Sequence, residues 1–173
     1  MNLAYKHLLP ENFDPKSRVW IYQSNRLFSV REALQLEEIL ESFVANWKSH
    51  GTPVKGFATL FFGQFIILMA DERATGVSGC STDSSVRMIQ LIEETFSVEL
   101  FNRQLLAFYQ KEKIELLPMQ QLSYAWQNGF INANTLYFNN LVDTKEALEQ
   151  QWMIPVYQSW LAQKLPPSSI QAS

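Results

Sequence analysis

The chain has 173 residues, 47% apolar and 13% aromatic, with a net charge of −3 and one cysteine. This apolar content excludes a disordered chain, and a single cysteine excludes an internal disulfide. No basic stripe is present, which argues against nucleic-acid binding. Only 18% of the residues are charged, below the usual quarter. The charged helix faces are therefore narrow, or an apolar surface meets a partner.

The longest apolar run, residues 65–70, is far too short to cross a bilayer. Residues 1–10 lack the continuous apolar stretch of a signal peptide. We therefore expect one soluble protein domain in a reducing cytoplasm, without membrane contact.

The N-terminal part predicts an irregular arm followed by a strand. Residues 1–17 have two prolines and mixed polarity, typical of an arm that lies over a sheet. Residues 18–24 alternate in polarity and are rich in β-branched and aromatic side chains, as strands are. Val19 and Ile21 face one side and the aromatic residues the other. We expect helices on one face of the sheet and the arm on the other.

The first helix is predicted from its N-cap and its apolar spacing. Ser29 and Glu32 form a capping-box pattern, and apolar residues recur at helical spacing over residues 30–49. Gly51 is expected to stop this helix, with Pro53 just beyond it.

Two strands, residues 54–62 and 64–70, follow with a tight turn at Gly63, since glycine adopts the positive φ of short hairpins. Residues 65–70 of the second strand are all apolar, which indicates a central strand covered on both faces. Thr82 or Asp83 is expected to cap the next helix.

That second helix is predicted over residues 84–96, and strands over 105–110 and 114–117. The order is strand, helix, strand, strand, helix, strand. It predicts an α+β protein with a ferredoxin-like βαββαβ core and an antiparallel sheet.

A helical C-terminal extension of the same domain is expected after the core. It contains a short edge strand at residues 136–138 and a helix over 144–164 that Pro155 kinks or splits. The predicted organisation is an arm (1–17), a core (18–118), the extension (119–165) and a flexible tail (166–173).

Parts of the core resemble a small uncharacterised bacterial family of the Bacteroidetes. The residues concerned are 20–26, 65–68 and 78–86, and the resemblance covers roughly residues 18–118. Members often bear the label "ABC transporter ATPase". That activity needs a glycine-rich phosphate loop ending in Gly-Lys-Ser/Thr, and this sequence has no such string. The resemblance therefore implies a bacterial source and no established catalytic residues.

Cys80 is the one candidate for a catalytic residue. It precedes the predicted helix by a few residues, where the helix dipole would stabilise a thiolate. A nucleophilic cysteine also needs a base, and the only histidines are His7 and His50. The alternative is a small residue buried in a tight turn.

Residues 76–85 also form a candidate anion-binding loop. Its glycines allow close backbone approach, and its hydroxyls and helix-start amides offer donors. Arg26, Arg73 and Arg87 are candidate counter-charges. The predicted ligand-binding residues are Gly76, Ser78, Gly79, Ser81, Thr82, Asp83, Arg26 and Arg87. The alternative is ordinary turn and cap chemistry, with Asp83 as the cap.

A metal site is the weakest hypothesis. Asp71 or Glu72 could join Asp83, but neighbouring strand residues point to opposite faces, so two carboxylates at most would converge. We therefore predict no metal and no cofactor.

The aromatic residues are interpreted first as core and, where exposed, as a protein interface. They are Trp20, Tyr22, Trp47, Trp126, Trp152, Tyr157 and Trp160. The leading hypothesis is a non-catalytic ligand-binding or protein-interaction domain whose site is the 76–85 loop. A small anion, a second copy or a protein partner would be bound. The alternative is a thiol-dependent enzyme using Cys80.

Overall fold

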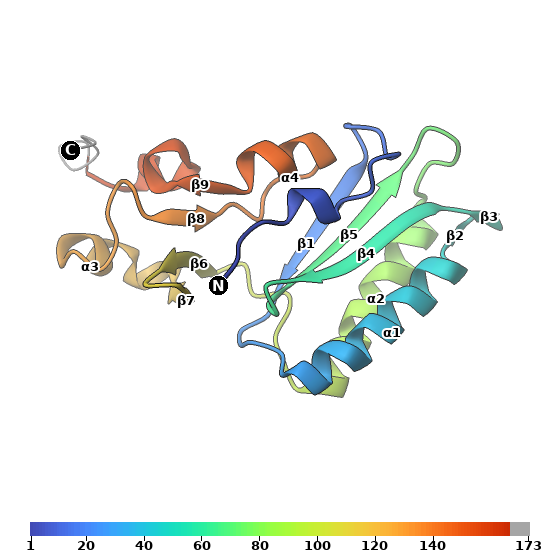
Figure 1. The fold of residues 1–173 in the computed structure, drawn as a ribbon, viewed down its shortest axis with the longest axis horizontal. Coiled ribbons are helices and arrows are strands. Elements are labelled where there is room, and N and C mark those ends of the chain that lie inside the picture. Colours follow the sequence, from blue (N-terminus) through green and yellow to red (C-terminus); the bar gives the residue numbers. More distant parts are fainter. Residues whose placement is uncertain (167–173) are drawn as a thin grey trace. The chain divides into compact units, whose positions relative to one another are not determined.

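A computed structural model describes residues 1–166 and shows two compact units (Figure 1). The N-terminal unit contains residues 2–101 and 142–149. The C-terminal unit contains residue 1, residues 102–141 and those from 150 onward. The chain passes from the first unit to the second after residue 101 and returns to the first unit for residues 142–149. Apart from Pro166, the predicted tail lies outside the described residues.

An antiparallel sheet with the order β1-β5-β4 forms the centre of the N-terminal unit. Its strands are β1 (Arg18–Gln23), β4 (Lys55–Phe61) and β5 (Phe65–Asp71). Every residue of β5 is buried, which confirms the central strand expected from its unbroken apolar sequence. The turn between β4 and β5 has Phe62 at φ 57° and Gly63 at φ 66°. The register pairs Phe61 with Phe65, so three residues, 62–64, form this hairpin loop, and positive φ is typical of such tight connections.

Two helices, α1 (Val30–Asn46) and α2 (Gly79–Phe96), cover one face of this sheet (Figure 1). The capping box of α1 is confirmed. The Ser29 hydroxyl accepts from the Glu32 amide, and the Glu32 carboxylate accepts from the Ser29 amide. The core between helices and sheet consists of Tyr22, Phe28, Leu36, Leu40, Ile66, Leu68, Met88, Ile89, Ile92, Phe96, Val98 and Leu100.

The N-terminal arm covers the opposite face, as its sequence predicts. Tyr5 packs against Phe61 with ring centroids 5.6 Å apart, and Phe13 packs against Phe57 at 6.5 Å. A short 3-10 helix, η1 (Lys6–Leu8), lies in the arm. The start of α4 (Lys145–Gln151) joins it through Lys145, whose Nζ donates to the Phe13 carbonyl at 3.2 Å.

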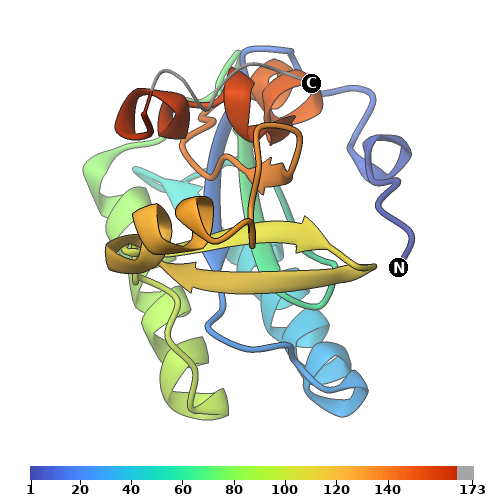
Figure 2. The same cartoon turned by 90° about the vertical axis from the view of Figure 1, so that its left-hand side faces the viewer.

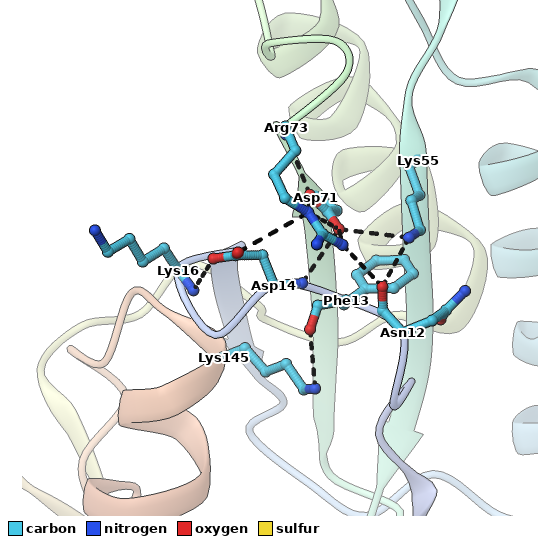
Figure 3. A network of polar contacts seen from close by, with 8 residues as sticks. All are labelled: Asn12, Phe13, Asp14, Lys16, Lys55, Asp71, Arg73 and Lys145. Carbon is cyan, nitrogen blue, oxygen red and sulfur yellow. Dashed lines mark hydrogen bonds and ion pairs between the residues drawn. The ribbon is translucent and has the colours of Figure 1, made fainter.

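A buried carboxylate fixes the arm to the end of β5 (Figure 3). Asp71 is 2% exposed and accepts from the Asp14 amide at 3.1 Å and from Arg73 Nε at 3.0 Å. Lys55 Nζ lies 3.4 Å from the same carboxylate. A buried charge is tolerated where such partners replace its water. Asp71 therefore connects arm, strand β4 and strand β5.

The C-terminal unit contains an antiparallel sheet with the order β7-β6-β8-β9. Its strands are β6 (Leu105–Gln110), β7 (Lys113–Pro118), β8 (Leu136–Phe138) and β9 (Met153–Pro155). Its helices are α3 (Leu122–Gln127), η2 (Met119–Gln121), η3 (Val156–Gln158) and η4 (Trp160–Lys164). Figure 2 shows the yellow β6–β7 hairpin with the orange α3 segment beside it. The core of this unit contains Leu106, Phe108, Leu122, Ala125, Ile131, Tyr137, Val156, Leu161 and Leu165.

The mixture of helices and antiparallel sheets confirms an α+β fold. The ferredoxin-like topology is not confirmed. The strand expected to complete its sheet is β6, which pairs with β7 and β8. The predicted short fifth strand is β7, and Lys111 and Glu112, both at positive φ, form the turn before it.

The expected helix over residues 144–164 is wrong. Helix α4 ends at Gln151, and Met153–Pro155 forms strand β9 beside β8. Proline disfavours helical backbone at the preceding residue and has no amide to donate, so it suits an edge strand such as β9. The predicted edge strand β8 is instead an inner strand with partners on both sides.

The predicted end of the first helix is also wrong. Helix α1 ends at Asn46, and β2 (Lys48–Ser49) pairs with β3 (Thr52–Pro53). Gly51 is therefore part of a hairpin turn, at φ 79°. Trp47 ends the helix because its ring is 2% exposed and its Nε1 donates to the Ser81 carbonyl of α2 at 3.0 Å.

Candidate functional site

The predicted anion-binding stretch forms the first turns of α2. The helix begins at Gly79, and its cap is Ser78, whose hydroxyl accepts from the Ser81 amide at 3.3 Å. The expected caps, Thr82 and Asp83, both lie inside the helix. Serine suits an N-cap as well as they do, and the later hydroxyls fit the helix by bonding to carbonyls one turn back.

Four hydroxyls of this stretch donate to backbone carbonyls of the same helix. Ser81 and Thr82 donate to the Ser78 carbonyl at 2.8 and 3.0 Å. Ser84 donates to Ser81, and Ser85 to Thr82, at 2.8 and 2.7 Å. A hydroxyl has one proton, and its remaining lone pairs repel an anion. In this arrangement these side chains do not donate to an anionic ligand.

The amides and glycines of the stretch give an anion little further support. The Val77 amide donates to the Glu72 carboxylate at 2.9 Å, and the Ser78 amide donates to the Ser49 hydroxyl at 3.2 Å. A Cβ added at Gly76 or Gly79 would meet nothing within 4 Å, and neither has a positive φ. These glycines are therefore not required for close backbone packing.

Arg26 lies at the wrong end of α2 to be a counter-charge for this stretch. Its two terminal nitrogens each donate to a Glu32 oxygen at 2.9 Å, and one also donates to the carbonyl of Phe96, the last residue of α2. The 18 residues of α2 span about 27 Å. The hydrogen bond from Arg26 lowers the pKa of Glu32 to about 2.

The other predicted counter-charges differ in their surroundings. Arg73 is paired with Asp71 and also donates to the Asn12 carbonyl at 2.9 Å. Arg87 is exposed on α2, more than two turns beyond the cap. Asp83, also exposed on α2, adds a negative charge close to the helix start.

The backbone of Cys80 lies in the first turn of α2, and its side chain lies outside the described residues. Both histidines are exposed: His7 is in η1, and His50 is in the turn between β2 and β3. The hypothesis of a thiol nucleophile therefore stays a prediction.

The carboxylates considered for a metal have protein partners. Asp71 is paired with Arg73, and Glu72 accepts from the Val77 amide and lies 3.5 Å from Arg18. Across residues 1–166, the described His, Cys, Asp and Glu side chains form no group of three or more that could hold a metal ion.

None of the five tryptophans, all of which lie within residues 1–166, is exposed. Trp47 and Trp152 are buried, and the other three are half-buried. Of the aromatic residues predicted as interface candidates, only Tyr157 is exposed, at 39%. The most exposed aromatic rings are Tyr124 at 63% and Phe130 at 61%, and both belong to the C-terminal unit.

A cleft of about 200 Å³ lies beside these two rings, between the β6–β7 hairpin and the α3 segment. Its walls are mainly apolar, with polar groups from Gln110, Glu115 and Gln121. The apolar lining comes from Phe108, Leu116, Leu117, Tyr124, Ala125, Phe130 and Ile131. Glu115 is the one residue of this lining that carries a formal charge at neutral pH.

The end of α3 holds the two exposed rings together. Gly129 has φ 71°, its amide donates to the Trp126 carbonyl at 3.2 Å, and the Phe130 amide donates to Ala125 at 2.9 Å. This is a Schellman motif, in which the residue after the glycine packs back on the helix. Phe130 accordingly stacks on Tyr124, with centroids 6.3 Å apart and planes 23° from parallel.

Gly129→Ala is expected to lower the free energy of unfolding by about 1 kcal/mol, since an alanine at this positive φ is strained. Nothing lies within 4 Å of the added methyl group, so backbone strain alone accounts for the loss. Urea unfolding measures it. Gly79→Ala, in the first turn of α2 with equal open space, is the control and should be unchanged or slightly more stable. Equal effects of the two substitutions would contradict the account of this turn.

Sequence patterns did not single out Tyr124 or Phe130. The available signal was the position of Phe130 directly after Gly129, because glycine commonly ends a helix and the following residue often packs back on it. Tyr124 lies between Leu122 and Ala125, the two buried residues of α3, and so lies off their stripe.

No protein-family model, curated protein or solved structure matches the chain. No helix within residues 1–166 combines the length and apolar character needed to cross a membrane. The geometry of the site is therefore the basis for a functional conclusion.

Proposed function

We propose that this chain is a polypeptide-binding module and that the cleft of the C-terminal unit is its binding site. The observation that carries the proposal is the exposed Tyr124–Phe130 stack at the border of an apolar cleft. Large apolar side chains rimmed by polar groups mark interaction sites, and aromatic residues are enriched there.

The size of the cleft favours a side chain as its occupant. Pockets for drug-sized ligands and cofactors measure about 300–1,000 Å³, whereas this cleft measures about 200 Å³. It would hold one large apolar side chain of a partner. Burying such an anchor contributes about 1.5–3 kcal/mol, so binding also needs contacts outside the cleft. The faces of Tyr124 and Phe130 would supply them.

The lining favours binding over catalysis. Acid–base or nucleophilic catalysis uses groups placed within hydrogen-bond reach of one another. Among the described lining residues, the ionisable side chains are Glu115 and Tyr124, and both are exposed. The two glutamines are suited to hydrogen bonds with a peptide backbone.

A selection from a random-peptide phage library tests this function. Peptides enriched on the intact protein should bind the double variant Tyr124→Ala, Phe130→Ala at least about tenfold more weakly in calorimetry, because both rings are lost from the interface. The substitutions remove exposed side chains, so stability should change little.

Leu27→Ala with Leu34→Ala is the matched control. Leu27 precedes α1 and Leu34 lies within it, both in the N-terminal unit, and they are 53% and 61% exposed. Peptide affinity should stay within about twofold of the parent. Absence of enriched peptides, or loss of binding in the control variant only, would refute the proposed site.

The proposal also includes three expectations from the sequence: the ferredoxin-like topology, the relation to a bacterial family and the cytoplasmic location. The order β1-β5-β4 with two helices on one face supports a ferredoxin-like unit without its fourth strand. Residues 20–26 and 78–86 support a relation to the uncharacterised bacterial family, and the single cysteine supports a reducing cytoplasm.

A further inference from the structure

Strand β7 has a partner on one side only. It pairs with β6 along its whole length, and in the part of the chain that the structure describes no strand pairs with its other side. Such an edge presents unpaired backbone donors and acceptors, to which an extended segment can add as a further strand.

The β6–β7 turn determines which backbone groups face outward. Lys111 and Glu112, at φ 48° and 61°, form a two-residue turn, so the flanking pair Gln110 and Lys113 is a hydrogen-bonded pair. Hydrogen-bonded pairs alternate with non-bonded pairs along an antiparallel ladder, so the backbone groups of Glu115 and Leu117 also bond to β6. The amides and carbonyls of Ile114 and Leu116 therefore point away from β6.

The same edge adjoins the cleft. Side chains two residues apart share a face of a strand, and Glu115 and Leu117 both line the cleft. Their cross-strand partners are Phe108 and Leu106, which belong to the core below the cleft. A strand added beside β7 would therefore direct alternate side chains toward the cleft.

We propose that the occupant of the cleft is an extended peptide that adds to the free edge of β7 in this way. One of its apolar side chains fills the cleft, and a lysine or arginine two residues away pairs with Glu115. The proposal rests on the polypeptide-binding function proposed above. Glu115 is the one charge in the lining, so charge complementarity selects a basic rather than an acidic peptide.

The edge also has features that protect it from unspecific pairing. Lys113 and Glu115 are exposed, and Pro118 has no amide. These features limit pairing to the four outward groups of Ile114 and Leu116. A short peptide with a matching charge is the segment that such an edge accepts.

An N-methyl scan of a peptide selected on the intact protein tests the strand addition. Methylation of the two peptide amides that bond to β7 should weaken binding about tenfold each, and methylation of the amide between them by less than about threefold. Equal sensitivity at successive positions would overturn the proposal.

Amide hydrogen exchange supplies the test on the protein. The bound peptide should slow exchange at Ile114 and Leu116 at least about tenfold. Glu115 and Leu117, whose amides bond to β6, are internal controls and should change little. Binding that requires Tyr124 and Phe130 but leaves the exchange of Ile114 and Leu116 unchanged would refute strand addition and retain the binding function. If no peptide binds, both the strand addition and the polypeptide-binding function are refuted.

Glu115→Gln tests the charge preference. The substitution keeps the size of this exposed side chain, so the fold should be unaffected. Peptides selected on the variant should lose the lysine or arginine found on the parent protein. The same basic residue at the same position in both selections would overturn the pairing with Glu115.

Discussion

Trp152→Ala is expected to lower the free energy of unfolding by about 3–5 kcal/mol. Trp152 is fully buried, packs on Phe138 with centroids 5.5 Å apart, and donates from Nε1 to Asn140 Oδ1 at 3.0 Å. Its carbonyl also accepts from the Asn139 amide at 2.6 Å, so the ring is fixed where β8 and β9 meet. Denaturant unfolding followed by circular dichroism measures the loss.

Two further variants identify the cause of that loss. Trp152→Phe keeps most of the buried area and should cost clearly less than the alanine variant. Leu141→Ala removes a side chain that is 63% exposed and should cost no more than about 0.5 kcal/mol. If Trp152→Ala cost no more than Leu141→Ala, the packing described for the C-terminal unit would be wrong.

Asp71→Asn is expected to destabilise the protein by about 2 kcal/mol at pH 7. An amide has the shape of the carboxylate but cannot form charge-assisted hydrogen bonds with Arg73 or accept with both atoms from its donors. The loss should also release the N-terminal arm, because the Asp14 amide bonds to this carboxylate. Urea unfolding and proteolysis within residues 1–17 measure the two effects.

The effect of Asp71→Asn should depend on pH. The hydrogen bond from Arg73 holds the pKa of Asp71 well below its usual range. A group whose pKa is lower in the folded protein contributes stability above its unfolded pKa, about 4, and loses it as the pH falls further. The difference in the free energy of unfolding between the parent protein and Asp71→Asn should therefore be constant from pH 7 to about pH 5 and shrink below about pH 4.

Asp83→Asn is the control for this series. Asp83 is exposed on α2, and its substitution should change stability by no more than about 0.5 kcal/mol at pH 7. The free energies of unfolding of the parent protein and of Asp71→Asn should converge at low pH. If they differed by the same amount down to the lowest pH at which the protein is folded, the role of the charge would be contradicted.

Periodic patterns predicted the N-terminal unit well. The unbroken apolar run of β5 and the capping box at Ser29 depend on neighbouring residues, so the sequence displays them directly. The end of α1 was missed because Trp47 is held by the Ser81 carbonyl, a partner 34 positions along the chain. A long-range contact of this kind leaves no local pattern.

The C-terminal unit and its site were harder to predict. Residues 144–164 were expected to be helical, but β9 forms because it pairs with β8, and strand pairing is absent from local sequence. The 76–85 stretch attracted attention because its hydroxyls could serve a ligand or a helix, and only coordinates show which carbonyls they bond to. The cleft forms where the β6–β7 hairpin meets α3. The two aromatic residues at its border, Tyr124 and Phe130, therefore follow no periodic pattern that could be recognised in the sequence.

The most direct test of the proposed site is a map of amide chemical shifts on the intact protein with a selected peptide. The largest changes should fall on Tyr124, Phe130 and Ile131 around the cleft, and on Ile114 and Leu116 of β7. Changes confined to residues 76–85, or to the exposed apolar residues of α1, would place binding elsewhere and contradict the account.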